Sequence, residues 1–199
     1  FSCESNNKTE VVQKEKEVFA KYLSCDVETL VKEGGNKFLL ASDSSLLSGG
    51  WLQSDEEAHS GNYSVKVGGK SKYALQVTFP EIKRDMFIRA TVWKKGSGGL
   101  LAFTSLETLK FDVYSKQVLE TDSNAWEKII LEAFVPANFS GEEIKLFVMN
   151  QKEEIVYFDD LEVKVYKSKP YPEYSEMENI DLIIDEDDIL HIDPGVQVY

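Results

Sequence analysis

The sequence predicts an all-β protein, an antiparallel β-sandwich, and two observations support this prediction. Short segments rich in Val, Ile, Phe and Tyr recur from Phe38 to Tyr166, and turn residues such as Gly68-Gly69 separate them. No helical period of apolar residues lies between these segments. Many short strands at such spacing are typical of two antiparallel sheets packed face to face.

The predicted strands follow one another along the middle of the chain, each bounded by Gly, Pro, Asn, Asp or Ser. In chain order they are Phe38–Ala41, Tyr63–Val67, Tyr73–Phe79, Met86–Lys94, Leu100–Thr104, Leu109–Tyr114, Trp126–Val135, Ile144–Asn150 and Ile155–Tyr166.

A short helix is expected before the first of these strands. The residues from Thr9 to Leu23 include no Gly or Pro and are rich in Glu, Gln, Lys and Ala, which favours a helix. The alternative is a weakly formed stalk that holds the following domain away from a membrane.

The chain is expected to divide into three parts. Residues 1–24 form a tether with the short helix, and residues 25–167 form the β-sandwich. Residues 168–199 form a Pro-containing linker and an acidic extension. Within this extension, Ile180–Asp185 alternates enough to begin a further unit, and the alternative is an acidic, mostly disordered tail.

The composition allows a folded core and argues against two classes of partner. Of the 199 residues 42% are hydrophobic, and the formal net charge is −13. Nucleic acids and anionic membrane surfaces attract clustered Lys and Arg, so neither is an expected partner. Nine acidic residues and no Lys or Arg lie between Glu173 and Asp193, so the acidity belongs mainly to the extension.

The amino-terminal residues suggest an attachment to a membrane by lipid rather than by a spanning helix. No segment reaches the roughly 18–20 apolar residues of a membrane span. The run Phe1-Ser2-Cys3 resembles the region around the processing site of a bacterial lipoprotein, in which Cys3 would carry the lipid. Cys25 is then expected to be a buried thiol, and a Cys3–Cys25 disulfide is the alternative.

Four local patterns occur in order along the chain. They are Gly49-Gly50-Trp51, the stretch Ser60–Ser64, a late strand from Trp126 to Pro136, and a closing strand that contains Asp159-Asp160. Together they resemble the galactose-binding-like jelly rolls of carbohydrate-binding modules, over about residues 26–167. The start at Cys3 resembles Bacteroidetes-type surface lipoproteins. The resemblance implies an exported outer-membrane lipoprotein that binds a poly- or oligosaccharide.

The resemblance also implies a structural calcium ion. Its expected ligands are Asp160, Asp43 from an early loop, and backbone carbonyls around Ser60 and Asn62, since Ca²⁺ prefers oxygen ligands. Strand alternation that points Phe158 inward would also point Asp160 inward and Asp159 outward. The alternative is that Asp160 caps a turn or pairs with a lysine.

A candidate ligand surface comes from two strands that alternate between an apolar face and a mixed face, Met86–Lys94 and Ile144–Asn150. The residues on the two mixed faces are Arg89, Trp93, Lys145 and Phe147. If the strands are neighbours, these residues form a patch where rings stack on a sugar and charged groups donate hydrogen bonds. The alternative is that the helix or a loop covers the rings. Trp51 and Trp126 are expected to face the core.

Signals for catalysis are weak. The chain has two histidines, and it lacks a nucleophile elbow, a Walker loop and a zinc-ligand spacing. The sequence therefore predicts a non-catalytic cell-surface module that binds glycan and contacts the membrane only through its lipid. The alternatives are a structural spacer, a protein-interaction domain of a surface assembly, or an accessory domain of a larger enzyme.

Overall fold

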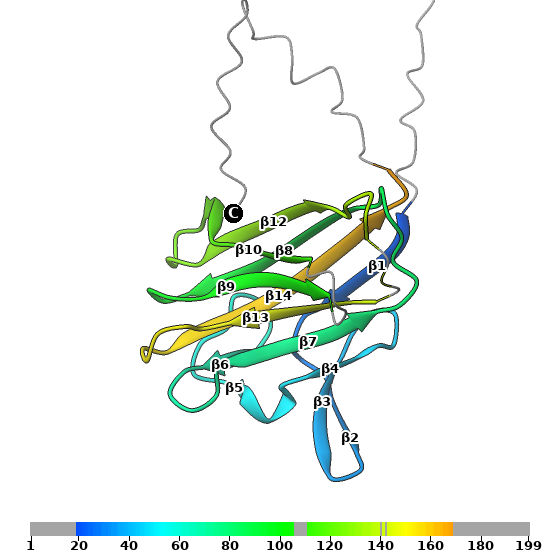
Figure 1. Ribbon diagram of the computed structural model, residues 1–199. Helices are drawn as coiled ribbons and strands as arrows, with labels where there is room; N and C mark the ends of the chain where they lie inside the picture. Colours follow the sequence, from blue (N-terminus) through cyan, green and yellow to red (C-terminus); the bar gives the residue numbers. More distant parts are fainter. Residues whose placement is uncertain (1–18, 106–110, 140, 142, 169–199) are drawn as a thin grey trace, which may run out of the picture.

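The computed structural model describes residues 19–105, 111–139, 141 and 143–168. These residues form two antiparallel sheets of seven strands each, stacked face to face as a sandwich (Figure 1). The predicted fold class is confirmed. No helix in this part of the chain is long and apolar enough to cross a membrane.

The first sheet has the strand order β11-β12-β8-β14-β6-β5, and β1 pairs with β14 beside this series. Its strands are β1 (Phe19–Cys25), β5 (Gln53–Ser54), β6 (Ser64–Val67), β8 (Phe87–Lys95), β11 (Gln117–Thr121), β12 (Glu127–Phe134) and β14 (Val156–Tyr166).

The second sheet has the strand order β10-β9-β13-β7-β4-β3-β2. Its strands are β2 (Leu30–Glu33), β3 (Asn36–Leu40), β4 (Leu46–Ser48), β7 (Tyr73–Phe79), β9 (Leu100–Ser105), β10 (Asp112–Ser115) and β13 (Ile144–Met149). A single 3₁₀ turn, η1 (Gly50–Leu52), connects the two sheets between β4 and β5.

The core lies between the sheets and follows the alternation of the strands. In β8 and β13 every second residue is buried and belongs to one continuous apolar cluster. These residues are Ile88, Ala90, Val92, Ile144, Leu146 and Val148. The predicted apolar faces of both strands are therefore confirmed. Burying each of the larger side chains stabilises the fold by about 1.5–3 kcal/mol.

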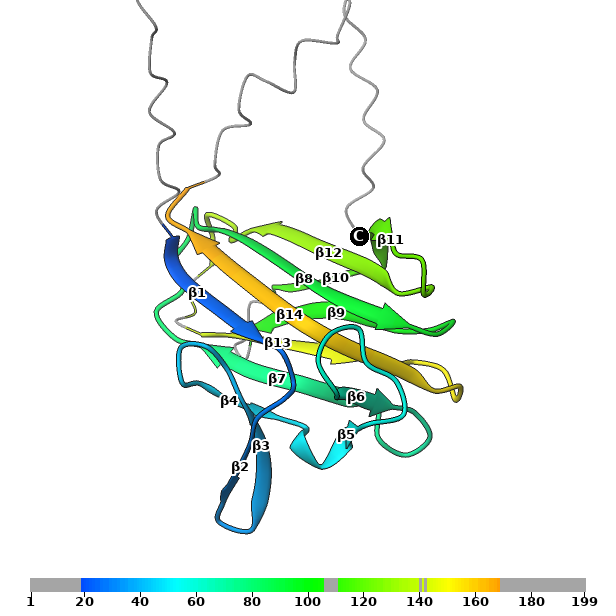
Figure 2. The same ribbon diagram turned by 180° about the vertical axis from the view of Figure 1, so that it is seen from behind.

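The predicted helix is wrong where the structure describes it, because Phe19–Cys25 is the strand β1. This strand runs antiparallel to the carboxyl-terminal half of β14 (Figure 2). Leu23 and Cys25 alternate into the core, and both are almost fully buried. The sandwich therefore begins by Phe19 and not at residue 25. The rest of the predicted helix lies outside the described residues, as do Cys3 and most of the acidic extension.

The strand β14 changes partner halfway along one edge. Its first residues pair with β6, where Phe158 lies opposite Val65, and its last residues pair with β1, where Leu161 lies opposite Cys25. On the other edge β8 accompanies both halves, with an irregularity between Asp159 and Glu162. The two adjacent aspartates therefore lie at the gap between β6 and β1.

Candidate functional site

The alternation predicted for the closing strand fails at the aspartate pair. Asp160 adopts a left-handed backbone conformation with φ of 48°, which interrupts the in–out order of the strand. As a result Asp159 is fully buried, and the Asp160 side chain stays about a quarter exposed. The prediction that Asp160 points inward and Asp159 outward is wrong.

The buried Asp159 carboxylate supplies acceptors where the strand ladder is interrupted. Its Oδ2 accepts the backbone N–H groups of His59 at 2.9 Å and Ser60 at 3.2 Å, and its Oδ1 accepts the N–H of Asp160 at 2.8 Å. Burial raises the pKa of Asp159 to about 7, and the negative charge of Asp160 adds to the rise, although the three hydrogen bonds oppose it. Asp159 is thus a structural group that ties the loop before β6 to β14.

The loop that Asp159 holds covers the indole of Trp93. The His59 and Trp93 rings are stacked, with centroids 3.9 Å apart, and the Lys128 ammonium lies 5.5 Å from the Trp93 centroid. The His59 Nδ1 atom is 2.7 Å from Asp160 Oδ2, which fixes the imidazole. Of the two readings of Trp93 that the sequence leaves open, a ring covered by a loop is the one observed.

The four predicted metal ligands are engaged in hydrogen bonds with protein groups. Ser60 donates a 2.8 Å hydrogen bond to Asp160, but Asp43 accepts one within its own loop and the Asn62 amide N–H donates to Glu28. In the described ranges no group of three or more His, Cys, Asp and Glu side chains could hold a metal ion. We assign no ion to these residues, and calcium binding stays a prediction.

The predicted sugar-binding patch is divided between opposite surfaces of the sandwich. Arg89 and Trp93 lie on β8 in the first sheet, whereas Lys145 and Phe147 lie on β13 in the second. Both pairs point away from the core, so the sandwich lies between them. The structure therefore contradicts the idea that the two strands are neighbours. Arg89 in addition is engaged with Glu132, with Nε 2.6 Å from the carboxylate.

The outer face of the second sheet keeps one half of the predicted patch and adds two tyrosines. Phe147 lies opposite Ala102 in β9, and Ala102 lies opposite Tyr114 in β10. On the other side of Phe147, Tyr73 packs its ring edge-on at 5.5 Å between centroids. We call Tyr73, Tyr114 and Phe147 the aromatic platform. Tyr114 is 71% exposed and Tyr73 46% exposed, so both rings are open to a ligand.

A depression of about 230 Å³ lies beside this platform, with Tyr114 and Phe147 among its walls. Ala102 forms part of its floor, because its small side chain leaves room between the two rings. Polar groups line the same depression, namely Thr104, Asp112 and Gln151. Rings beside hydrogen-bonding side chains are the combination that holds sugars in a shallow site.

The sequence missed the tyrosines of the platform for identifiable reasons. Tyr73 begins a predicted strand whose alternation is broken at Leu75, which has a φ of 49°. Tyr114 follows the predicted pattern with Asp112, but nothing in the local sequence says that β10 lies two strands from β13. The prediction for Trp126 is confirmed, since it is buried, and the prediction for Trp51 is wrong, since it is 55% exposed in η1.

Cys25 is the buried thiol that the sequence predicts. It is 2% exposed and free, and its Sγ lies 3.8 Å from the carbonyl oxygen of Leu40. Burial raises the pKa of this thiol to about 11. Because a thiolate is the reactive form, Cys25 is expected to be inert in the folded protein.

No family model and no curated protein matches the chain. Among solved structures it is similar to the CBM22-1 xylan-binding domain from Paenibacillus barcinonensis Xyn10C, with 14% identity, a TM-score of 0.46, and coverage of 73% of this chain and 94% of that one. A family 16 carbohydrate-binding module is 16% identical, with a TM-score of 0.39 and coverage of 56% and 82%.

A cyclase from Fischerella sp. TAU is also similar, at 13% identity and a TM-score of 0.43, with coverage of 75% of this chain and 86% of that one. Carbohydrate-binding modules and an enzyme thus occur side by side among the similar structures. Likenesses at these identities and TM-scores assign no function, so the aromatic platform has to support any functional conclusion.

Proposed function

We propose that this chain is a non-catalytic glycan-binding module that holds sugar rings on the aromatic platform of the second sheet. The observation that supports the proposal is the exposure of Tyr114 and Tyr73, with Tyr114 and Phe147 lining a mainly apolar depression that also holds three polar side chains. Exposed rings stack on the C–H faces of sugars, and neighbouring hydroxyl, carboxylate and amide groups bond the sugar hydroxyls. The proposed site includes Lys145 and Phe147 and excludes Arg89 and Trp93, which lie on the other sheet.

The test is a glycan-array screen of the protein, followed by calorimetry with the glycan that binds most tightly. Tyr114→Ala and Phe147→Ala are each expected to weaken binding about fivefold or more, because a stacked ring contributes on the order of 1 kcal/mol or more. Trp51→Ala and Trp93→Ala are the matched controls. Trp51 has an exposed ring, Trp93 has a ring covered by His59, and neither belongs to the platform. Loss of binding in a control, with the platform variants unchanged, would contradict the proposal.

Attachment to the cell surface through Cys3 is part of the proposal. A lipidated Cys3 would place the platform outside the cell, where polysaccharides are found. Mass spectrometry of the protein purified from its own membrane fraction is expected to show diacylated Cys3. A Cys3→Ser variant is expected to be absent from that membrane fraction. An unmodified Cys3 in the native protein would remove this part of the proposal.

A protein-interaction role is the second candidate, and the strand β11 favours it. This strand forms one edge of the first sheet, and all five of its residues are exposed, including Val118 at 44% and Leu119 at 56%. An open strand edge can pair with a strand of another chain. Sedimentation is expected to show self-association that Leu119→Lys abolishes, and a monomer at all concentrations would count against a second copy as the partner.

A further inference from the structure

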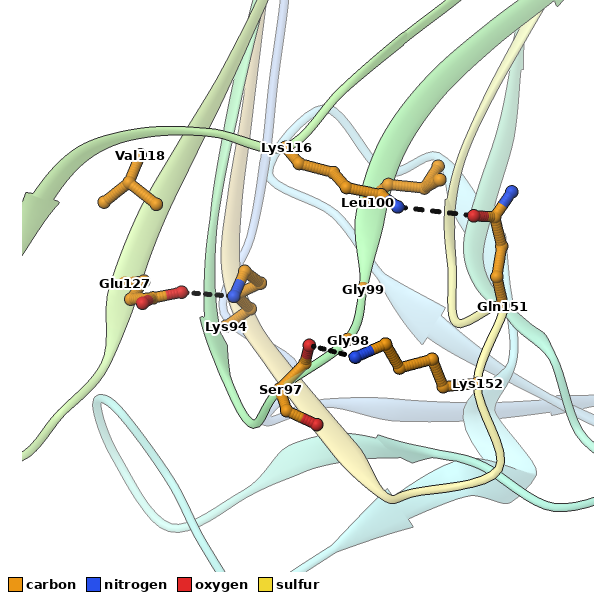
Figure 3. Close-up of a pocket in the computed structure, with 10 residues that line it drawn as sticks. All are labelled: Lys94, Ser97, Gly98, Gly99, Leu100, Lys116, Val118, Glu127, Gln151 and Lys152. Atoms are coloured by element: carbon orange, nitrogen blue, oxygen red, sulfur yellow. Dashed lines mark hydrogen bonds and ion pairs between the residues drawn. The ribbon is translucent and has the colours of Figure 1, made fainter.

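A second depression, of about 220 Å³, lies at the end of the sandwich where the strand β8 turns into β9 (Figure 3). Its walls come from three separate connections: the Gly-rich β8–β9 loop, the short link between β10 and β11, and the β13–β14 loop. Each connection places a charged or polar side chain at the opening. We call this depression the lysine pocket, after Lys94, Lys116 and Lys152.

Lys94 is the buried member of the pocket. It stands at the end of β8 at a position that points between the sheets, and its side chain is only 7% exposed. Its ammonium group donates to the carboxylate of Glu127 and to the carbonyl oxygen of Gly96. Glu127 is more exposed, at 38%, so a buried ammonium is paired with a partly exposed carboxylate at one wall of the pocket.

Lys116 and Lys152 form no ion pair with a carboxylate among the described residues, and both are hydrogen-bonded to neutral groups. The Lys116 ammonium donates to the side-chain carbonyl oxygen of Gln151, and the Lys152 ammonium donates to the backbone carbonyl of Ser97, both at 3.3 Å. Both acceptors are neutral. With one carboxylate against three ammonium groups, the pocket is positive, although the whole chain carries a net charge of −13.

The lysine pocket adjoins the depression beside the aromatic platform. Leu100 and Gln151 line both of them. A ligand that lies on the rings of Tyr114 and Phe147 is therefore next to the pocket, and the hydrogen-bonded side chains of Lys116 and Gln151 lie at the boundary. A water molecule takes roughly 30 Å³ of liquid, so the pocket has room for a substituent of several heavy atoms.

We infer that the lysine pocket binds the carboxylate or sulfate group of an acidic glycan whose neighbouring sugar lies on the aromatic platform. This inference rests on the proposed glycan-binding function and names its ligand class. An anion would replace the two neutral acceptors of Lys116 and Lys152 with charge-assisted hydrogen bonds, which are the stronger kind. The ion pair between Lys94 and Glu127 would remain in place.

The test compares acidic probes with neutral counterparts that have the same sugar backbone. Polygalacturonate is measured beside its methyl-esterified form, and dextran sulfate beside dextran, so that the two arms distinguish carboxylate from sulfate. The double variant Lys116→Met with Lys152→Met keeps the apolar stems and removes the charges. Lys83→Met is the matched control, because Lys83 is exposed near the opposite end of β8. Melting temperatures of all variants check that they fold.

An acidic probe is expected to bind the native protein more tightly than its neutral counterpart. The double variant is expected to lose this preference, with an affinity reduced about tenfold or more, since a hydrogen bond to a charged group contributes that much. Salt is expected to weaken the native protein's binding of the acidic probe more than that of the neutral one. Lys83→Met is expected to behave as the native protein does.

Two results would overturn the inference, and they separate it from the proposed function. Equal binding of acidic and neutral probes, lost in Tyr114→Ala but unchanged in the double lysine variant, would leave the glycan-binding module standing without an acidic ligand. Failure of every charged and neutral polysaccharide to bind the folded native protein would remove both. Acidic binding that needs the lysines but not the platform would support the pocket and overturn the platform.

Discussion

The Asp159 carboxylate is buried and accepts hydrogen bonds from three backbone N–H groups. The three N–H groups it accepts come from two segments, one before β6 and one within β14. These donors lie at the gap between β6 and β1, so without the carboxylate they would lack a strand partner there. Desolvation of the charge outweighs the hydrogen bonds, and the pKa of the group stands near 7 and not near 3.8.

This shifted pKa predicts a pH dependence of stability with a definite sign. Because the folded protein favours the protonated acid, Asp159 stabilises it most below about pH 4, and this contribution is lost as the pH rises to about 7. A shift of this size corresponds to roughly 4 kcal/mol at most. The free energy of unfolding, measured by urea titration, is therefore expected to fall for the native protein relative to Asp159→Asn between these pH values.

Asn is the suitable comparison because it has the shape of the protonated acid and does not titrate. Above pH 8 the difference between the two proteins is expected to be constant, since Asp159 is then ionised in both the folded and the unfolded chain. A difference that stays level from pH 4 to pH 8, or grows in the opposite direction, would show that the buried carboxylate keeps an ordinary pKa.

His59 is the second residue whose role the structure defines. It stacks on Trp93, lies edge-on to Trp126 at 5.7 Å, and meets Asp160 through Nδ1. His59→Ala is expected to reduce the free energy of unfolding by about 1–2 kcal/mol and to make tryptophan fluorescence easier to quench with acrylamide. His59→Phe keeps a ring without the hydrogen bond. If acrylamide quenches the tryptophan fluorescence of His59→Phe as easily as that of His59→Ala, stacking is not what covers Trp93.

At the scale of elements, β1 is where composition misled the sequence prediction. A segment rich in Lys and Glu without Gly or Pro favours a helix by intrinsic propensity, but pairing with β14 overrides that weak preference. The spacing of Leu23 and Cys25 by two residues was the local sign of a strand. A pattern this short is not decisive, since the partner strand is more than 130 residues away in the chain.

The strand β1 makes a quantitative prediction through two neighbouring residues. Leu23 is fully buried and Tyr22 is 43% exposed. Leu23→Ala is expected to cost about 2–5 kcal/mol of unfolding free energy, and Tyr22→Ala, as the matched control, less than about 1 kcal/mol. Equal small effects in chemical denaturation would indicate that β1 adds little to the sandwich in solution.

Most of the longer strands were predicted well, and most of the short ones were not. The bounds of β7 match the prediction, and those of β8, β9, β12 and β13 agree within one residue at each end. The strands β2, β4, β5 and β11 were missed because they are short or have no buried face. At β14 the aspartates were singled out correctly, but a left-handed Asp160 reversed which of them is buried.

At the scale of the whole molecule, the sequence could assign faces of strands but not the sheets to which they belong. The outward positions of Trp93 and Phe147 followed from period-two alternation. Their separation by the full thickness of the sandwich follows from strand order, which depends on contacts between segments far apart in the chain. The sequence does not reveal the lysine pocket for the same reason, because Lys94 comes from the end of β8 and Lys116 and Lys152 come from two separate connections.

The overall charge gives a further prediction about the proposed ligand. The nine acidic residues between Glu173 and Asp193 account for most of the net charge of −13. A chain that ends at Ser168 is therefore expected to bind polygalacturonate several-fold more tightly at low ionic strength, through reduced long-range repulsion. In about 1 M salt, where the Debye length is about 3 Å, the two chains are expected to bind alike. A difference that persists at high salt would mean the extension acts by contact.

The pairing of β1 with β14 also determines when the first sheet can be completed. As a chain is synthesised, β1 emerges before every other described strand, and the strand it needs emerges last. Closing so long a loop is slow, because its entropic cost comes before the contacts that repay it. Until then Leu23 and the unpaired edge of β1 are open to other chains. Folding of the newly made protein is therefore most vulnerable to aggregation just before its final strand arrives.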